Sequence, residues 1–213
     1  MRVWFVVLVM LAGFTAFGQT PDTITVFHRY YTTTFDRTKH YPVIVKYWLT
    51  KEMYACNTKL KRTNKFTPDP AIPDETNLKQ DYKRSGYDRG HNMPAEDNKC
   101  DAVGMEECFY YSNMCPQTHS FNAGAWEKLE KYARKKAKTY DSVLVWCGSV
   151  SLGSKTIGRV SVPDYCWKVI HIQKLGIIEA YSFKNDASPA QPLAYYKVSV
   201  DSVYHLSGFK YEE

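Results

Sequence analysis

The segment from Ala123 to Tyr140 restricts the fold of this chain more than any other part of the sequence. Within it, apolar residues recur at three- and four-residue spacing, which places them on one side of a helix. They are Trp126, Leu129, Ala133, Ala137 and Tyr140, and the opposite side carries Lys128, Lys131, Lys135 and Lys138. The pattern predicts one long amphipathic helix that packs its apolar face on a hydrophobic partner.

Several strand candidates surround this helix. Runs rich in β-branched and aromatic residues predict strands at 43–49, 142–150, 166–173 and 176–183, with weaker candidates at 109–114 and 195–203. A hairpin is expected around Leu175-Gly176, and prolines make 53–87 irregular. Strands and helices do not alternate strictly, so we predict an α+β fold, with a mostly antiparallel central sheet flanked by helices.

The first eighteen residues have the layout of a secretory signal peptide. Arg2 precedes an apolar run from Val3 to Phe14, and the small residues Ala16 and Gly18 frame a cut before Gln19. We therefore expect a signal peptide at 1–18, one domain at 19–213, and a secreted or periplasmic protein without stable membrane association after cleavage. An uncleaved membrane anchor is the alternative, although the run is shorter than the roughly 20 residues of a typical span.

The six cysteines all follow the expected cut: Cys56, Cys100, Cys108, Cys115, Cys147 and Cys166. An even number behind a signal peptide favours disulfides. Cys147 with Cys166 is the first pair we expect, because both lie on strand candidates. A zinc site made of Cys100, Cys108, Cys115 and His119 is the weaker alternative, since no C-x-x-C pair is present.

The formal net charge is +6 and falls to +5 without residues 1–18. A modest positive excess suits a polyanionic partner without proving one. The charge is concentrated in two stretches: Lys59, Lys61, Arg62 and Lys65, and then Lys128, Lys131, Arg134, Lys135, Lys136 and Lys138. On charge alone, an ordinary solvated face is the favoured interpretation of each stretch.

Two groups of residues carry the chemistry. The first is Asp88-Arg89-Gly90-His91, followed by Pro94-Ala95. The second comprises Ser112-Asn113-Met114, Pro116-Gln117, Asn122, Gly124, Trp126, Leu129 and Glu130. In this order they resemble the DNA/RNA non-specific endonuclease family, the ββα-metal nucleases. Arg62, at the start of R-x-x-x-F-x-x-D-P, and Arg134 also fit, and Val162-Pro163 with Trp167-Lys168 agrees more loosely.

The resemblance implies a ββα-metal nuclease that hydrolyses DNA and RNA with little sequence preference and leaves 5′-phosphate ends. It implies that His91 is the general base, because a neutral imidazole can accept a proton near neutral pH. It also implies that Asn122 is a ligand to Mg²⁺, with Mn²⁺ as a substitute, since an amide oxygen is a hard ligand. A helix cap is the ordinary alternative for Asn122.

Charged residues complete the implied site. Glu130 matches a residue that orients groups around the metal without binding it, and it can also pair with Arg134 four residues later. Arg62 and Arg134 match phosphate-binding arginines, whose planar forks of donors fit phosphate oxygens. Lys61 or Lys65 can substitute for Arg62. Arg89 is a further substrate-binding candidate, although Asp88, Arg89 and Gly90 more simply shape the turn before His91.

Other functions are compatible with parts of this pattern. A catalytically silent nucleic-acid-binding module would need the basic stretches alone, but the intact set of His91, Asn122, Glu130 and Arg134 argues against it. A delivered toxin with an immunity partner would be expected to carry a delivery domain, and none is evident. The sequence leaves open a homodimer, the preference for DNA or RNA, and the existence of an inhibitor.

Overall fold

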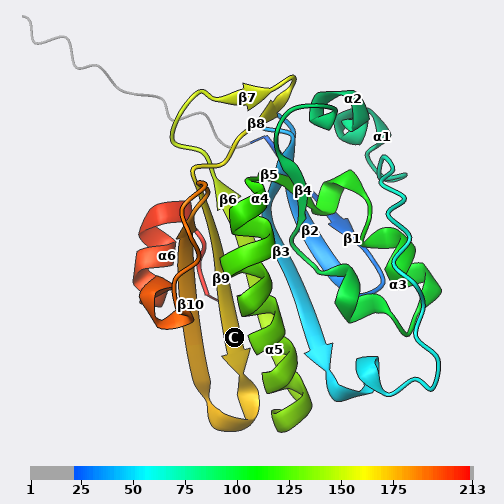
Figure 1. Ribbon diagram of the computed structural model, residues 1–213, viewed down its shortest axis with the longest axis vertical. Helices are drawn as coiled ribbons and strands as arrows, with labels where there is room; N and C mark the ends of the chain where they lie inside the picture. Colours follow the sequence, from blue (N-terminus) through cyan, green and yellow to red (C-terminus); the bar gives the residue numbers. More distant parts are fainter. Residues whose placement is uncertain (1–21, 212–213) are drawn as a thin grey trace, which may run out of the picture.

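The computed structural model describes residues 22–211, and the expected signal peptide at 1–18 lies outside them. A seven-stranded antiparallel sheet forms the centre, in the order β1-β2-β3-β6-β9-β10-β11 (Figure 1). Its strands are β1 (Thr23–Phe27), β2 (Tyr31–Asp36), β3 (Tyr41–Thr50), β6 (Ser142–Val150), β9 (Tyr165–Ile172), β10 (Ile177–Lys184) and β11 (Lys197–Val198). The predicted α+β class and antiparallel sheet are confirmed.

The helix α5 (Glu127–Tyr140) covers one face of this sheet (Figure 1). Leu129, Ala133 and Ala137 are buried against strand residues such as Val145 and Ile170, as the apolar spacing predicted. A three-residue turn, α4 (His119–Phe121), and a π-helical turn (Asn122–Trp126) lead into α5. The helical segment is therefore continuous with the residues expected to carry the site.

The opposite face of the sheet is covered by α6 (Val200–Ser207) and the residues that follow it. Leu144, Trp146 and Val169 point to this side and pack with Val203 of α6. The central strand β6 is thus buried on both faces, which explains its nearly continuous apolar sequence.

The remaining elements are short, and most pack beside α5 over β1, β2 and β3 (Figure 1). They are α1 (Pro73–Thr76), α2 (Lys79–Tyr82), α3 (Ala102–Glu107), the pair β4 (Asp88–His91) and β5 (Met114–Gln117), and the pair β7 (Thr156–Ile157) and β8 (Val160–Ser161). Single 3-10 turns occur at Lys51–Tyr54, Ala95–Asn98, Tyr111–Asn113, Gln173–Leu175 and Leu193–Tyr196. Within residues 22–211, no helix is long and apolar enough to cross a membrane.

Two strand predictions are wrong. The 109–114 candidate forms a 3-10 turn at Tyr111–Asn113, and the strand begins only at Met114. Of the 195–203 candidate only β11, Lys197–Val198, is a strand. Ser199 then starts α6 by accepting a hydrogen bond from the Ser202 backbone N–H at 3.0 Å. The hairpin at 175–176 is confirmed, with β9 and β10 paired on either side of it.

The disulfide prediction is right in kind and wrong in its pair. Cys56 and Cys100 are bonded, whereas Cys147 and Cys166 are buried free thiols on neighbouring strands. Cys147 lies opposite Lys168, so Cys166 is two positions out of register. Diagonal neighbours of this kind are about 7–8 Å apart, which is too far for a disulfide. The zinc alternative is also excluded, since Cys100 is bonded to Cys56.

Candidate active site

The predicted D-R-G-H motif forms the whole of strand β4, whose partner β5 lies antiparallel to it. Gly90 faces Cys115 in this pair, and a Cβ at Gly90 would lie 2.2 Å from the side chain of Gln117. Only glycine therefore allows Gln117 to pass so close to β4. The crowding, and not an unusual backbone angle, explains the glycine directly before His91.

His91 ends β4 with its ring enclosed. The residue is 7% exposed, and its ring makes edge contacts with Phe66 and Phe109 at centroid distances of 5.7 and 5.0 Å. Trp126 donates a hydrogen bond from its indole Nε1 to the His91 carbonyl oxygen at 2.9 Å. The π-helical turn before α5 thus fixes the backbone that presents this histidine.

The environment of His91 keeps its imidazole neutral. Burial, assisted by the positive charges of Arg62 and Arg89, lowers the pKa of His91 to about 3. Its Nε2 atom is buried and has no hydrogen-bond partner within residues 22–211. A neutral ring nitrogen without a partner can accept a proton from a molecule that enters the site.

Asn122 is held in place by Asp88, from the opposite end of β4. The Asn122 amide nitrogen donates to Asp88 Oδ2 at 2.9 Å, and His119 Nδ1 lies 2.9 Å from the same oxygen. This contact leaves the amide oxygen of Asn122 for another ligand. The helix-cap alternative is wrong, because Asn122 has helical backbone angles inside the continuous helical segment and its side chain caps no end of it.

A cleft of about 510 Å³ brings five of the six predicted site residues together. Its lining includes Arg62, His91, Asn122, Glu130 and Arg134, which come from the loop before residue 66, β4, the π-helical turn and α5. The sixth, Arg89, is exposed and does not line the cleft. Its guanidinium stacks 4.2 Å above the ring of Phe66, which itself touches His91.

Arg134 is paired differently from the prediction. Its Nη1 donates to Asp97 Oδ1 at 2.9 Å, where Tyr54 also donates its hydroxyl at 2.9 Å, and no ion pair joins Arg134 to Glu130 within the described range. Asp97 is only 1% exposed and lies in the turn after the D-R-G-H motif. The sequence offered no sign of this pair, because the two residues are far apart along the chain.

The Glu130 carboxyl lies in a strongly charged environment. Burial raises its pKa to about 7, Lys168 and Arg134 act to lower it, and Asp97 acts to raise it. Lys168, on β9, is completely buried, with its ammonium 3.2 Å from the Tyr47 hydroxyl and 4.2 Å above the Trp126 ring. Its position inside an apolar strand, together with the loose family match of Trp167-Lys168, was the signal that could have identified it.

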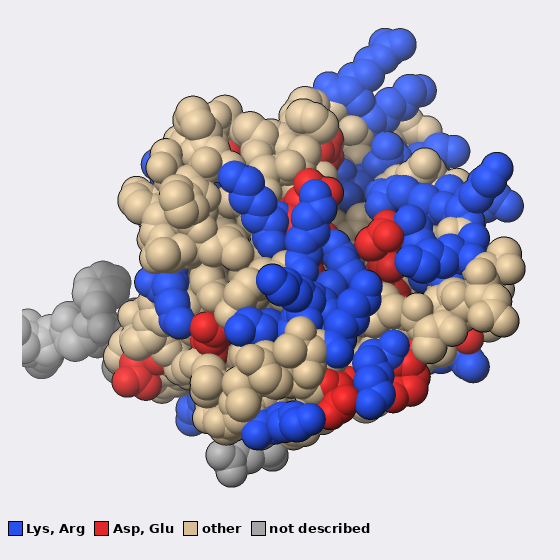
Figure 2. Space-filling model, turned by 60° about the horizontal axis from the view of Figure 1, so that its bottom comes forward, with Lys and Arg blue, Asp and Glu red and all other residues tan. Residues whose placement is uncertain are grey.

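Exposed basic side chains are numerous on the two segments that contribute to the cleft, α5 and the loop before Phe66. Figure 2 shows a face of the molecule on which Lys and Arg side chains crowd the surface and acidic side chains form smaller groups. The exposed side of α5 supplies Lys128, Lys131, Lys135 and Lys138, and the loop before Phe66 supplies Lys59, Lys61, Arg62 and Lys65. Of this loop, Arg62 lines the cleft and Lys61 and Lys65 do not.

The cleft fits a hard cation that keeps most of its water. Across residues 22–211, no group of three or more His, Cys, Asp or Glu side chains is placed to cage a metal ion. The amide oxygen left over on Asn122 is a hard, neutral donor, and the cleft has room for several water molecules beside it. Mg²⁺ is commonly held in this way, by one or two protein oxygens and several waters.

Comparison with known proteins agrees with the motifs. The family model for DNA/RNA non-specific endonuclease matches residues 13–213. The Xenopus laevis mitochondrial nuclease EXOG is 34% identical over 68% of this chain and 46% of its own length. Nuclease 1, mitochondrial, of Schizosaccharomyces pombe is 33% identical over 84% of this chain and 63% of its own. The chain therefore spans about half to two thirds of these relatives.

A solved structure is similar across most of the fold. One chain in the crystal structure of the EndoG/EndoGI complex, described as showing the mechanism of EndoG inhibition, superposes with a TM-score of 0.78. It is 31% identical, and the match covers 88% of this chain and 84% of that one.

The expectation of a secreted or periplasmic protein is wrong, because these relatives are named mitochondrial nucleases. A third relative, the Mitochondrial nuclease of Saccharomyces cerevisiae, is 37% identical over 64% of this chain and 46% of its own length. The charged start and apolar run that suggested export are too general to identify a destination. Four of the six cysteines are free thiols, so the cysteine count was not an argument for an oxidising compartment either. On the motifs, the fold and the match over residues 13–213, this chain belongs to the DNA/RNA non-specific endonuclease family.

Proposed function

We propose that this chain is a Mg²⁺-dependent endonuclease that hydrolyses DNA and RNA with little regard for base sequence. One observation carries the proposal: the unpartnered, buried Nε2 of a neutral His91 and the uncommitted amide oxygen of Asn122 belong to the same cleft. A base and a metal ligand in one cleft are what hydrolysis of an anionic phosphodiester requires.

His91 accepts a proton from a water molecule as that water attacks phosphorus. The bond from phosphorus to the 3′ oxygen then breaks, and the departing 3′ oxygen takes a proton from solvent water, which leaves a 5′-phosphate and a 3′-hydroxyl. Asn122 would hold Mg²⁺, or Mn²⁺ in its place, and the bound ion would neutralise charge on the phosphate and stabilise the leaving oxygen. Asp88 supports this step indirectly, because it orients the Asn122 amide.

Arg62 and Arg134 line the same cleft and supply positive charge to the phosphate. Arg62 is the more available of the two, since Arg134 already binds Asp97. Glu130 orients groups around the ion, and Arg89 binds substrate outside the cleft. Contacts to the backbone carry little sequence information, which supports weak base specificity.

The test is turnover of plasmid DNA and of RNA against Mg²⁺ concentration for His91→Ala and Asn122→Ala. His91→Ala should slow cleavage about 10²–10⁴-fold at every Mg²⁺ concentration, because it removes only the base. Asn122→Ala should recover partly at high Mg²⁺. The exposed residues His205 and Asn77 provide matched controls, His205→Ala and Asn77→Ala, which should cleave at the parental rate.

Each outcome separates the alternatives. Binding of nucleic acid without cleavage by the parental protein would support a silent binding module instead. A His91→Ala defect that disappears at high Mg²⁺ would make His91 a metal ligand and reverse the two roles. A homodimer stays a prediction, which light scattering of the purified protein can check.

A further inference from the structure

The loop that carries Arg62 has little structure of its own. It runs from Ala55 to Phe66 without helix or strand, and residues 57–65 are all exposed. Its apolar contribution to the core is correspondingly small. A segment of this kind stays in one position only where specific contacts hold it.

No carboxylate among the described residues anchors the Arg62 guanidinium. Its guanidinium lies 5.0 Å over the ring of Phe109, and its Nε donates to Asn64 on the same loop at 2.7 Å. Within residues 22–211 it makes no ion pair. This contrasts with Arg134, which is anchored on buried Asp97. The position of the Arg62 guanidinium therefore depends on the path of its loop.

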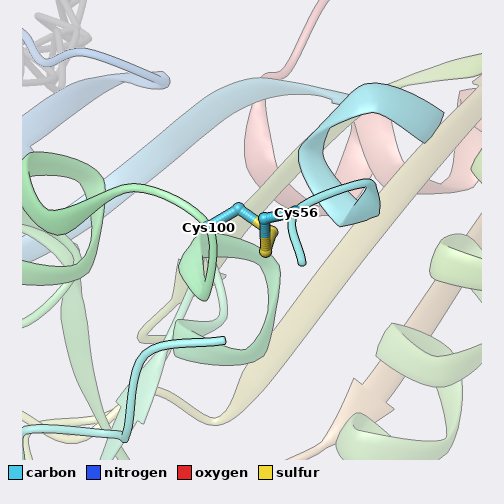
Figure 3. The surroundings of a disulfide bond; sticks show 2 residues. All are labelled: Cys56 and Cys100. Carbon is cyan, nitrogen blue, oxygen red and sulfur yellow. A yellow bond between two sulfur atoms is a disulfide. The ribbon is translucent and has the colours of Figure 1, made fainter. Parts of the chain in front are cut away.

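Two adjacent contacts fix the start of that path. The Cys56–Cys100 disulfide joins the loop to the chain just after the 3-10 turn Ala95–Asn98 (Figure 3). Beside it, the Leu60 backbone N–H donates to the Lys99 carbonyl at 2.8 Å. The turn at 95–98 contributes to the wall of the active-site cleft, so the disulfide attaches the arginine loop to the cleft itself.

We propose that the Cys56–Cys100 disulfide is a positioning element for Arg62, so that its reduction weakens substrate binding at the active site without unfolding the protein. The proposal rests on the function proposed above. In the reduction, the two thiols of a reductant such as dithiothreitol are oxidised to a disulfide, and Cys56 and Cys100 each gain a proton and an electron. The other four cysteines are already thiols.

The fold is expected to survive this reaction. The main core is built from α5 and the central strands, with Val45, Val145 and Ile170 among its buried residues, and exposed residues 57–65 add nothing to it. Loss of the crosslink removes one of the two contacts at the start of the loop and leaves the Leu60–Lys99 hydrogen bond there. At the other end, the Thr67 backbone still bonds to Phe109 and Tyr111. The loosened part is thus the part that bears Arg62.

The first measurement is kinetic. KM and kcat for a short DNA duplex are compared for the oxidised protein, for the protein reduced with dithiothreitol, and for Cys56→Ser/Cys100→Ser. Reduction should raise KM about tenfold and change kcat less than about threefold, because a loosened phosphate contact weakens binding more than chemistry. The double variant should match the reduced enzyme and ignore the reductant. An unchanged KM after complete reduction overturns the proposal.

The second measurement asks whether the effect passes through Arg62. In Arg62→Ala, reduction should change KM no further, whereas Lys59→Ala on the same loop should respond like the parent. The two single changes and their combination form a cycle that isolates the coupling. A full tenfold effect of reduction in Arg62→Ala means that the disulfide acts elsewhere, and that result also overturns the proposal.

Hydrogen exchange supplies a readout that does not depend on cleavage. The Leu60 amide should exchange at least about tenfold faster after reduction, while the amide of buried Val145 in β6 stays protected. Equal protection of the Leu60 amide in both states refutes the positioning role of the disulfide even if the chain cleaves nothing. Faster exchange at Leu60 without any nuclease activity in either state would instead reject the proposed function. The disulfide would then be a purely structural link between the loop and the turn at 95–98.

Discussion

The burial of His91 and the environment of Glu130 make opposite predictions for stability against pH. The pKa of His91 is about 3 in the folded chain and about 6.5 when unfolded. Below pH 6.5 the unfolded chain therefore binds a proton at His91 that the folded chain does not bind. The free energy of unfolding consequently decreases as pH is lowered. Glu130 behaves in the reverse way, because its pKa of about 7 exceeds its ordinary value of 4.5. As pH falls from 7, the folded chain binds a proton at Glu130 before the unfolded chain does, and the free energy of unfolding increases.

The size of each effect follows from the shifts. One pH unit between the folded and unfolded pKa values corresponds to about 1.4 kcal/mol. His91 should therefore remove about 3 kcal/mol of folding free energy between pH 6.5 and 4.5, and Glu130 should return up to about 3 kcal/mol between pH 7 and 4.5. In the parental protein the two contributions to the slope of unfolding free energy against pH largely cancel. Replacing either residue should therefore expose the contribution of the other.

Urea unfolding at pH 7, 6 and 5, with a chelator present, measures these slopes. Relative to the parent, His91→Gln should gain about 1.4 kcal/mol of unfolding free energy for each pH unit below 6.5. Glu130→Gln should lose a comparable amount over the same range. The exposed residue His205 provides the control His205→Gln, which should run parallel to the parent. If His91→Gln also runs parallel, the ring is not buried in its neutral form, and the argument for a ready base fails.

Three further outcomes test other parts of the structure. Asp88→Ala should raise the Mg²⁺ concentration needed for half-maximal cleavage about 10–100-fold, because Asn122 loses the partner that orients its amide; an unchanged Mg²⁺ profile would contradict that role. Gly148→Ala should lower the unfolding free energy by about 1–3 kcal/mol in urea titrations, since a Cβ there would lie 1.9 Å from the Val43 carbonyl oxygen. Binding of DNA in a chelator should weaken steeply with salt, and neutralising the exposed lysines of 128–138 should flatten that dependence, as anisotropy titrations can show.

The parts of the fold that could be predicted are those whose pattern is local and strong. The apolar spacing of 126–140 and the β-rich runs around Val145, Val169 and Ala180 gave α5, β6, β9 and β10, since burial of one element on another leaves a periodic record in the sequence. The strands β1 and β2 were missed. Their many threonines hide the alternation, because a half-buried threonine satisfies either side of a sheet.

Other features depend on contacts that a sequence does not record. The Asn113 side chain binds the backbone of Met93 and Cys108 at 2.8–2.9 Å, which turns an aromatic, strand-like run into a 3-10 turn. Local propensity cannot anticipate a partner twenty residues away. Within the site, the motifs identified the residues of the cleft, whereas Asp97 beneath Arg134 became visible only once the chain was folded.

The π-helical turn at Asn122–Trp126 has a consequence for how this active site can change. A π turn is in effect one extra residue inserted into an α-helix, and each residue of an α-helix turns the chain by about 100°. If the same residues instead formed a regular α-helix, each would turn the chain further, and Asn122 would rotate about a quarter turn relative to Glu130 and Arg134. The amide that now meets Asp88 would then point elsewhere. Regular helical geometry and the present position of Asn122 are thus in conflict along this one turn, and the wide turn keeps Asn122 in phase with the helix behind it.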